Sequence, residues 1–194
     1  MRKKIPGLGL EIAQSLQRNV SLDELFNENN VNEASKERFL ESFLQSFYEN
    51  ALTRTRLFPN VKKTLDKLSR KFKLALITRR HAPKDLVKKE LERLQLHQYF
   101  ASIVTALEVV RPAPFPDTIL KAAKDLEVST TNCVVISDSA VDIEAGKSVG
   151  AKTIAVLSGL FQRKELLKAE PDLIIKDINH IIEYVPLWNN GSIL

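Results

Sequence analysis

Short apolar runs alternate with helix-forming segments through the chain after residue 57. Each run is a few residues long and rich in Val, Ile and Leu, which is typical of a buried strand. The runs cover residues 74–77, 102–105, 133–137, 152–156 and 173–175. Between these runs, apolar residues recur at helical spacing. The segments concerned are one that ends near residue 70, those at 83–94, 116–126 and 141–149, and one that ends near residue 184. This order predicts right-handed βαβ units and therefore an α/β fold with an open parallel sheet flanked by helices.

The residues before this alternation have the pattern of helices. Ser21 and Glu24 have the spacing of a capping box, and apolar side chains recur every three or four positions over residues 32–48. The sequence thus predicts a helical region, an α/β core and a short tail, at residues 1–56, 57–185 and 186–194.

Composition excludes several classes of protein. Hydrophobic residues are 44% and charged residues 27% of the 194, a globular balance that excludes a disordered chain. The single cysteine, Cys133, excludes a disulfide framework and a multi-cysteine metal site, and it favours a reducing compartment. No apolar run approaches the roughly 20 residues of a membrane span, and Glu11 interrupts any signal segment. We therefore expect a cytoplasmic protein without a membrane anchor.

The chain carries 29 basic and 24 acidic side chains, a modest excess of five positive charges. The densest basic patch runs from Lys62 to Lys73. Nucleic-acid binding would also require interleaved aromatic residues or a reader motif, and the sequence offers neither. A solvated helix face is therefore favoured over an RNA-binding surface, and the oligomeric state is left open.

An acidic loop follows the predicted strand 133–137. Asp138 stands at the end of this strand and Asp142 falls in the first turn of the next helix, so both carboxylates can reach one point. Ser137 and Ser139 lie in the same loop. Hard oxygen ligands of this kind suit Mg²⁺. The alternative is that Asp138 and Ser139 cap the helix while Asp142 interacts with its dipole.

Two further segments could bind an anion. Thr78 and Arg79 follow the strand 74–77 directly, at the edge of a parallel sheet where ligands bind, so a hydroxyl and a guanidinium could hold a phosphate. An ordinary solvated turn is the alternative. Arg111 stands in a loop stiffened by three prolines before the helix 116–126.

In this order, the three segments resemble the haloacid dehalogenase-like superfamily, and particularly its phosphoglycolate phosphatase-like branch with a helical cap. The match covers about residues 57–185, and residues 7–56 resemble most of the cap. The acidic loop from Ser137 to Asp142 is similar to the family's G-D-S-x-x-D motif, and Thr78 to its phosphate-binding hydroxyl. The resemblance implies a Rossmann-like core, Mg²⁺ as cofactor, a small phosphorylated metabolite as ligand and an aspartate that attacks the phosphoryl group.

The sequence departs from the family pattern at three places. The motif D-x-D-G-T, which carries the nucleophile on a central strand, is not found upstream of the cap. Ala113 occupies the position of the family's lysine, with Arg111 as the nearest substitute, and Ser137 replaces a glycine. The sheet should therefore have a gap between the strands ending at Ile77 and Ile136 unless these edges close together or another segment fills it.

These departures lead to two functional hypotheses. The first is a catalytically impaired relative, a pseudoenzyme that retains a Mg²⁺ and phosphate site. The second is a small-molecule phosphomonoesterase whose first strand lies outside these 194 residues. An RNA-associated protein ranks below both.

Overall fold

The computed structural model describes residues 53–80 and 82–185, together with isolated positions before residue 53. The chain divides into two compact units, Met1–Ala51 and Leu52–Leu194, and all the described strands belong to the second. The helices predicted before residue 53 and the predicted tail lie outside the described residues, apart from those isolated positions. The cap-like role of the first region therefore stays a prediction.

The predicted alternation of strands and helices is confirmed. The described strands are β1 (Ala75–Thr78), β2 (Ser102–Thr105), β3 (Val134–Ser137), β4 (Lys152–Val156) and β5 (Leu173–Ile175). The α-helices are α4 (Val61–Ser69), α5 (Lys84–Arg93), α6 (Asp117–Asp125), α7 (Ala140–Ser148) and α8 (Arg163–Leu166). The predicted last helix is a 3₁₀-helix, η5 (Ile178–Glu183). Neither α8 nor the short 3₁₀ turns were predicted, because four or fewer residues do not show a helical period.

The strands form two parallel sheets, in the orders β1-β2 and β3-β4-β5. Ala75 pairs with Ser102 in the first sheet, and Val134 with Lys152 in the second. In the part of the chain that the structure describes, no ladder joins β1 to β3. Among the described strands, the edges of β1 and β3 do not pair with each other, so the alternative that these two edges close together is wrong.

Burial follows this break between β1 and β3. All four residues of β2 are buried, whereas all four of β1 and all four of β3 are only half-buried, although both strands are largely apolar. Strands β1 and β3 border the break, where no described strand pairs with them, so part of each strand stays accessible. Within the described residues, strand β2 also pairs on one edge only, but helices α5 and α6 pack on it and it is fully buried.

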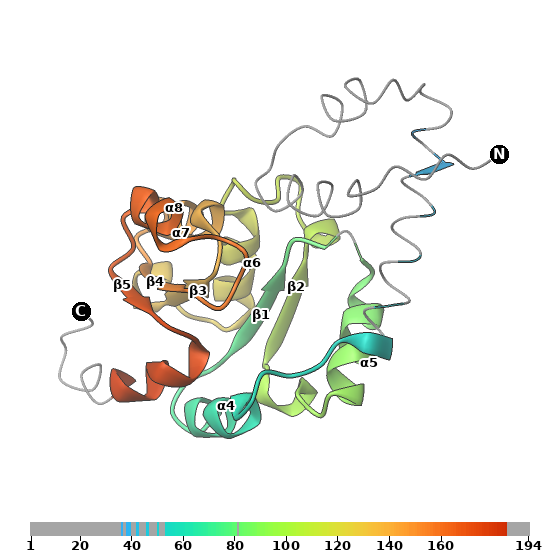
Figure 1. Cartoon of the computed structure of the whole chain (residues 1–194). Helices are drawn as coiled ribbons and strands as arrows, with labels where there is room; N and C mark the ends of the chain where they lie inside the picture. Colours follow the sequence, from blue (N-terminus) through green and yellow to red (C-terminus); the bar gives the residue numbers. More distant parts are fainter. Residues whose placement is uncertain are drawn as a thin grey trace. The chain divides into compact units, whose positions relative to one another are not determined.

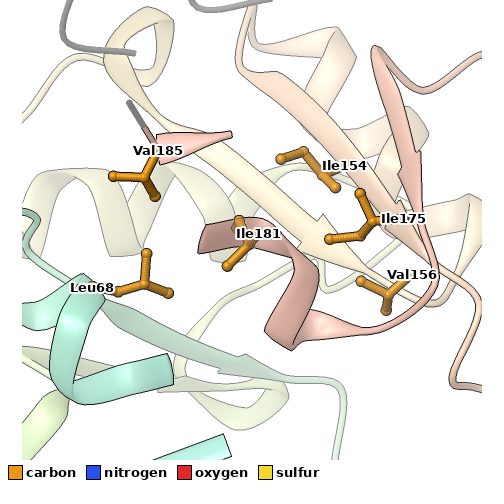
Figure 2. Close-up of a cluster of buried hydrophobic side chains, with 6 residues drawn as sticks. All are labelled: Leu68, Ile154, Val156, Ile175, Ile181 and Val185. Carbon is orange, nitrogen blue, oxygen red and sulfur yellow. The ribbon is translucent and has the colours of Figure 1, made fainter. Parts of the chain in front are cut away.

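Helices and one apolar cluster hold the two sheets in a single core. Helix α6 packs on β1 and β2, and α7 packs on β3 and β4 (Figure 1). Figure 2 shows the cluster, in which Leu68 of α4 lies beside side chains of the second sheet and of η5. Its buried members are Leu68, Ile154, Val156, Ile175, Ile181 and Val185. Leu74, before β1, and Val134 of β3 both pack against it, so the beginnings of the two edge strands share one layer.

No helix in the described residues is both long and apolar enough to cross a membrane.

Candidate functional site

The loops that follow β1 and β3 meet at one edge of the core. Arg79 follows β1 directly, and its Nε lies 3.8 Å from Oδ1 of Asp142, in the first turn of α7. The two side chains are 23% and 28% exposed. The structure therefore brings together the phosphate-binding and metal-binding segments that the sequence predicted separately.

Hydroxyl groups order the acidic loop. Ser137 Oγ donates a hydrogen bond of 2.8 Å to Asp142 Oδ2 and accepts one of 3.1 Å from the backbone N–H of Ser139. Ser139 is 1% exposed, and its Oγ has no partner among the described residues. Although Ser139 is the N-cap of α7 by position, no side chain caps that helix. Side-chain capping by Asp138 and Ser139 is therefore not observed, whereas Asp142 does lie in the first turn of α7, as the alternative predicted.

Asp138 lies against the loop that follows β4. A Cβ built on Gly159 would overlap the Asp138 side chain, so this close approach requires glycine at position 159. In the described part of the chain, the Asp138 carboxylate makes no hydrogen bond or ion pair. Gly159 was not among the site residues predicted from the sequence. Its signal was a glycine soon after the carboxyl end of a predicted strand, where a functional loop is expected.

The environment of Asp142 opposes its ionisation. Burial raises the pKa of this carboxyl group above its ordinary value, and the Asp138 charge adds to the effect, while Arg79 and the Ser137 hydroxyl act in the opposite direction. A second cation close to this carboxylate would further favour the charged form.

The acidic loop has donors that fit Mg²⁺. Asp138 and Asp142 supply carboxylate oxygens, and the orphaned, buried Oγ of Ser139 is a further hard donor beside them. Within the described residues, no group of three or more His, Cys, Asp or Glu side chains gathers at one point. The candidate acidic ligands within the described residues are thus a pair.

The remaining predicted phosphate ligands differ in their surroundings. Thr78 Oγ1 accepts a hydrogen bond of 3.2 Å from the backbone N–H of Arg80, whose guanidinium lies 2.7 Å from the buried carboxylate of Glu90. Arg111 lies 3.2 Å from Asp117 and over the ring of Phe115. Its contacts within the described residues do not include the loops after β1 and β3.

The haloacid dehalogenase-like hydrolase family model matches residues 12–156. The chain belongs to this family. The match spans both the acidic loop and the Thr78 loop, so the resemblance inferred from the sequence is confirmed.

Curated relatives and solved structures agree with this assignment. The chain is 32% identical over 155 residues to the phosphoglycolate phosphatase of Aquifex aeolicus, covering 77% of this chain and 72% of that protein. It is 29% identical over 147 residues to the Escherichia coli phosphoglycolate phosphatase, covering 75% of this chain but only 58% of that protein. A predicted phosphoglycolate phosphatase from Haemophilus somnus has the same fold, with a TM-score of 0.73 at 22% identity over 84% of this chain and 73% of that one.

Proposed function

We propose that this chain binds a small phosphorylated molecule together with Mg²⁺ at the edge formed by the loops after β1 and β3. The observation that carries the proposal is the meeting of those loops through Arg79 and Asp142. Thr78 and the adjacent backbone would hold phosphate oxygens, while Asp138 and Asp142 would hold the cation. A bound Mg²⁺ would neutralise charge on the phosphoryl oxygens. The similarity to phosphoglycolate phosphatases supports a small phosphorylated ligand.

We further propose that these 194 residues do not hydrolyse the ligand through an aspartyl-phosphate. No Asp-x-Asp sequence occurs in them, and Ala113 supplies no cation where the family has a lysine. Arg111, the nearest substitute, has Asp117 as its partner. The remaining residues support binding without a covalent step.

Calorimetry and a turnover assay on the full chain test this proposal. We expect inorganic phosphate to bind in the presence of Mg²⁺, Thr78→Ala to weaken that binding about tenfold or more, and no phosphate to be released from p-nitrophenyl phosphate. Thr131→Ala, at an exposed threonine of η3, is the matched control and should bind as the wild type does. If the wild type releases phosphate and Asp138→Asn abolishes this release, the proposed lack of hydrolysis is wrong. If the wild type does not bind phosphate, the proposed site is wrong.

The second candidate is a phosphomonoesterase that acquires its nucleophile from polypeptide beyond these 194 residues. Among the described strands, nothing pairs with the facing edges of β1 and β3, which favours this candidate because a further strand could pair with both. The protein isolated from its natural source should then be larger than 21.9 kDa and should release phosphate from phosphoglycolate. A native mass equal to that of this chain would exclude this candidate.

A further inference from the structure

The two carboxylates of the acidic loop are not equivalent. Both oxygens of Asp142 have a partner, since Ser137 donates to Oδ2 at 2.8 Å and the Arg79 guanidinium approaches Oδ1 at 3.8 Å. Asp138, in contrast, makes no hydrogen bond or ion pair within the described residues, and its side chain lies against the main chain at Gly159. The Asp138 carboxylate is therefore available to a cation, whereas the Asp142 carboxylate already faces the Arg79 guanidinium.

A metal ion that binds Asp142 must compete with the Arg79 guanidinium. A hydroxyl leaves lone pairs on the carboxylate accessible, but a guanidinium is a permanent positive charge that repels any further cation approaching the same oxygens. The distance of 3.8 Å is longer than an ideal charge-assisted hydrogen bond, and the Arg79 side chain is partly exposed. The contact between the guanidinium and Asp142 is therefore an ion pair at partly exposed side chains rather than a short, buried hydrogen bond.

We propose that Arg79 is an internal counter-ion of Asp142 that competes with Mg²⁺ for this carboxylate. The acidic pair then binds the ion fully only when the Arg79 side chain turns away. This inference rests on the proposed function, because it assumes that Asp138 and Asp142 are the cation ligands. It adds a determinant of metal affinity that lies on the loop after β1, outside the acidic motif itself.

Neighbouring Arg80 provides a matched control. It carries the same charge one residue further along, but its guanidinium lies 2.7 Å from Glu90, which is 7% exposed. Arg80 is thus held by a different carboxylate. Removing either guanidinium lowers the charge of the loop by the same amount, but only Arg79→Gln removes the cation that lies beside Asp142.

Isothermal titration of the full chain with Mg²⁺ at fixed ionic strength tests the competition, with thermal melts to verify that each variant is folded. We expect Arg79→Gln to bind Mg²⁺ about tenfold or more tightly than the wild type, and Arg80→Gln to bind as the wild type does. Arg79→Lys retains the charge and should stay within about threefold of the wild type. The double variant Arg79→Gln, Asp142→Asn should not bind Mg²⁺ as tightly as Arg79→Gln alone.

Three results would overturn the inference, and one of them would also overturn the proposed metal site. Equal or weaker Mg²⁺ binding by Arg79→Gln, with measurable binding by the wild type, overturns the competition and leaves the proposed site intact. Binding by Arg79→Lys as tight as that of Arg79→Gln also contradicts a competition based on charge. No Mg²⁺ binding by either the wild type or Arg79→Gln overturns the competition and the proposed metal site together.

Discussion

At the scale of single residues, the position of Asp138 depends on the absence of a side chain at residue 159. The Asp138 side chain occupies the space that a Cβ at Gly159 would need. Asp138 could be predicted because it directly follows an apolar run that has the pattern of a buried strand. The position of Gly159 after a predicted strand marked a loop, but its contact with Asp138 could not be predicted, because that contact joins two separate loops and only the folded chain shows it. The same limit applies to Arg79, which was predicted to hold phosphate and was not predicted to contact Asp142.

Gly159→Ala should therefore weaken metal binding without touching a ligand. The added methyl group would force Asp138 aside, and displacing the support of a metal ligand typically costs about 10–100-fold in affinity. Titration with Mg²⁺ measures the loss. Ser158→Ala is the control in the same loop and should bind as the wild type does. Unchanged affinity in Gly159→Ala would mean that Asp138 is not a ligand or that the loop moves without cost.

At the scale of elements, helix α7 packs on β3 and β4 so closely at Gly146 that only a small residue fits there. A Cβ at Gly146 would lie 3.0 Å from a methyl group of Thr153 and 3.1 Å from Val135. The sequence predicted the helix and the two strands correctly. It did not show which helical position faces the sheet most closely, since α7 is apolar and small on more than one face and its periodicity is weak.

Gly146→Val should lower the free energy of unfolding by about 1–3 kcal/mol, because overpacking a tight contact forces the helix and strands apart. Urea denaturation measures the change. Glu144→Val places the same β-branched residue at an exposed position of α7 and controls for helix propensity. Equal losses in the two variants would contradict the close packing at Gly146.

The pairing of β5 with β4 depends on Asp172, just before β5. Its carboxylate accepts hydrogen bonds from the backbone N–H of Thr153 at 2.8 Å and from Lys152 at 3.0 Å. Burial opposes the charge of Asp172, but these hydrogen bonds outweigh it and lower the pKa below the ordinary 3.8. A lowered pKa in the folded state contributes stability that is present above pH 3.8 and is lost as the pH falls through the folded value.

Asp172→Asn should thus cost about 1–2 kcal/mol of unfolding free energy at pH 7 and progressively less as the pH is lowered below 3.8. Urea denaturation of both proteins across this range gives the difference directly. Asp66→Asn, which removes the exposed i,i+4 partner of Arg70, should change the stability by less than about 0.5 kcal/mol at every pH. A cost for Asp172→Asn that grows towards acid pH would contradict the assigned direction of the pKa.

At the scale of the whole core, local pattern and long-range order were predictable to different degrees. Apolar runs and helical spacing placed all five described strands, because each strand is bounded by turns or helix signals in its own neighbourhood. The break between β1 and β3 followed only from the family pattern, in which a further strand lies there. That helices α4 and η5 keep the two sheets in one core was not predicted, since Leu68 and Ile181 meet across more than 100 residues of sequence.

The break predicts uneven protection of backbone amides. Among the described strands, β4 pairs on both edges, with β3 and with β5, whereas β1 pairs only with β2 and β3 only with β4. We expect amides on the unpaired edges of β1 and β3 to exchange with solvent at least about tenfold faster than those of β4, as measured by hydrogen exchange and NMR at two protein concentrations. Slow exchange throughout β1 and β3 in dilute solution would show that their edges are paired within one chain. Protection that appears only at the higher concentration would instead show that a second copy covers them.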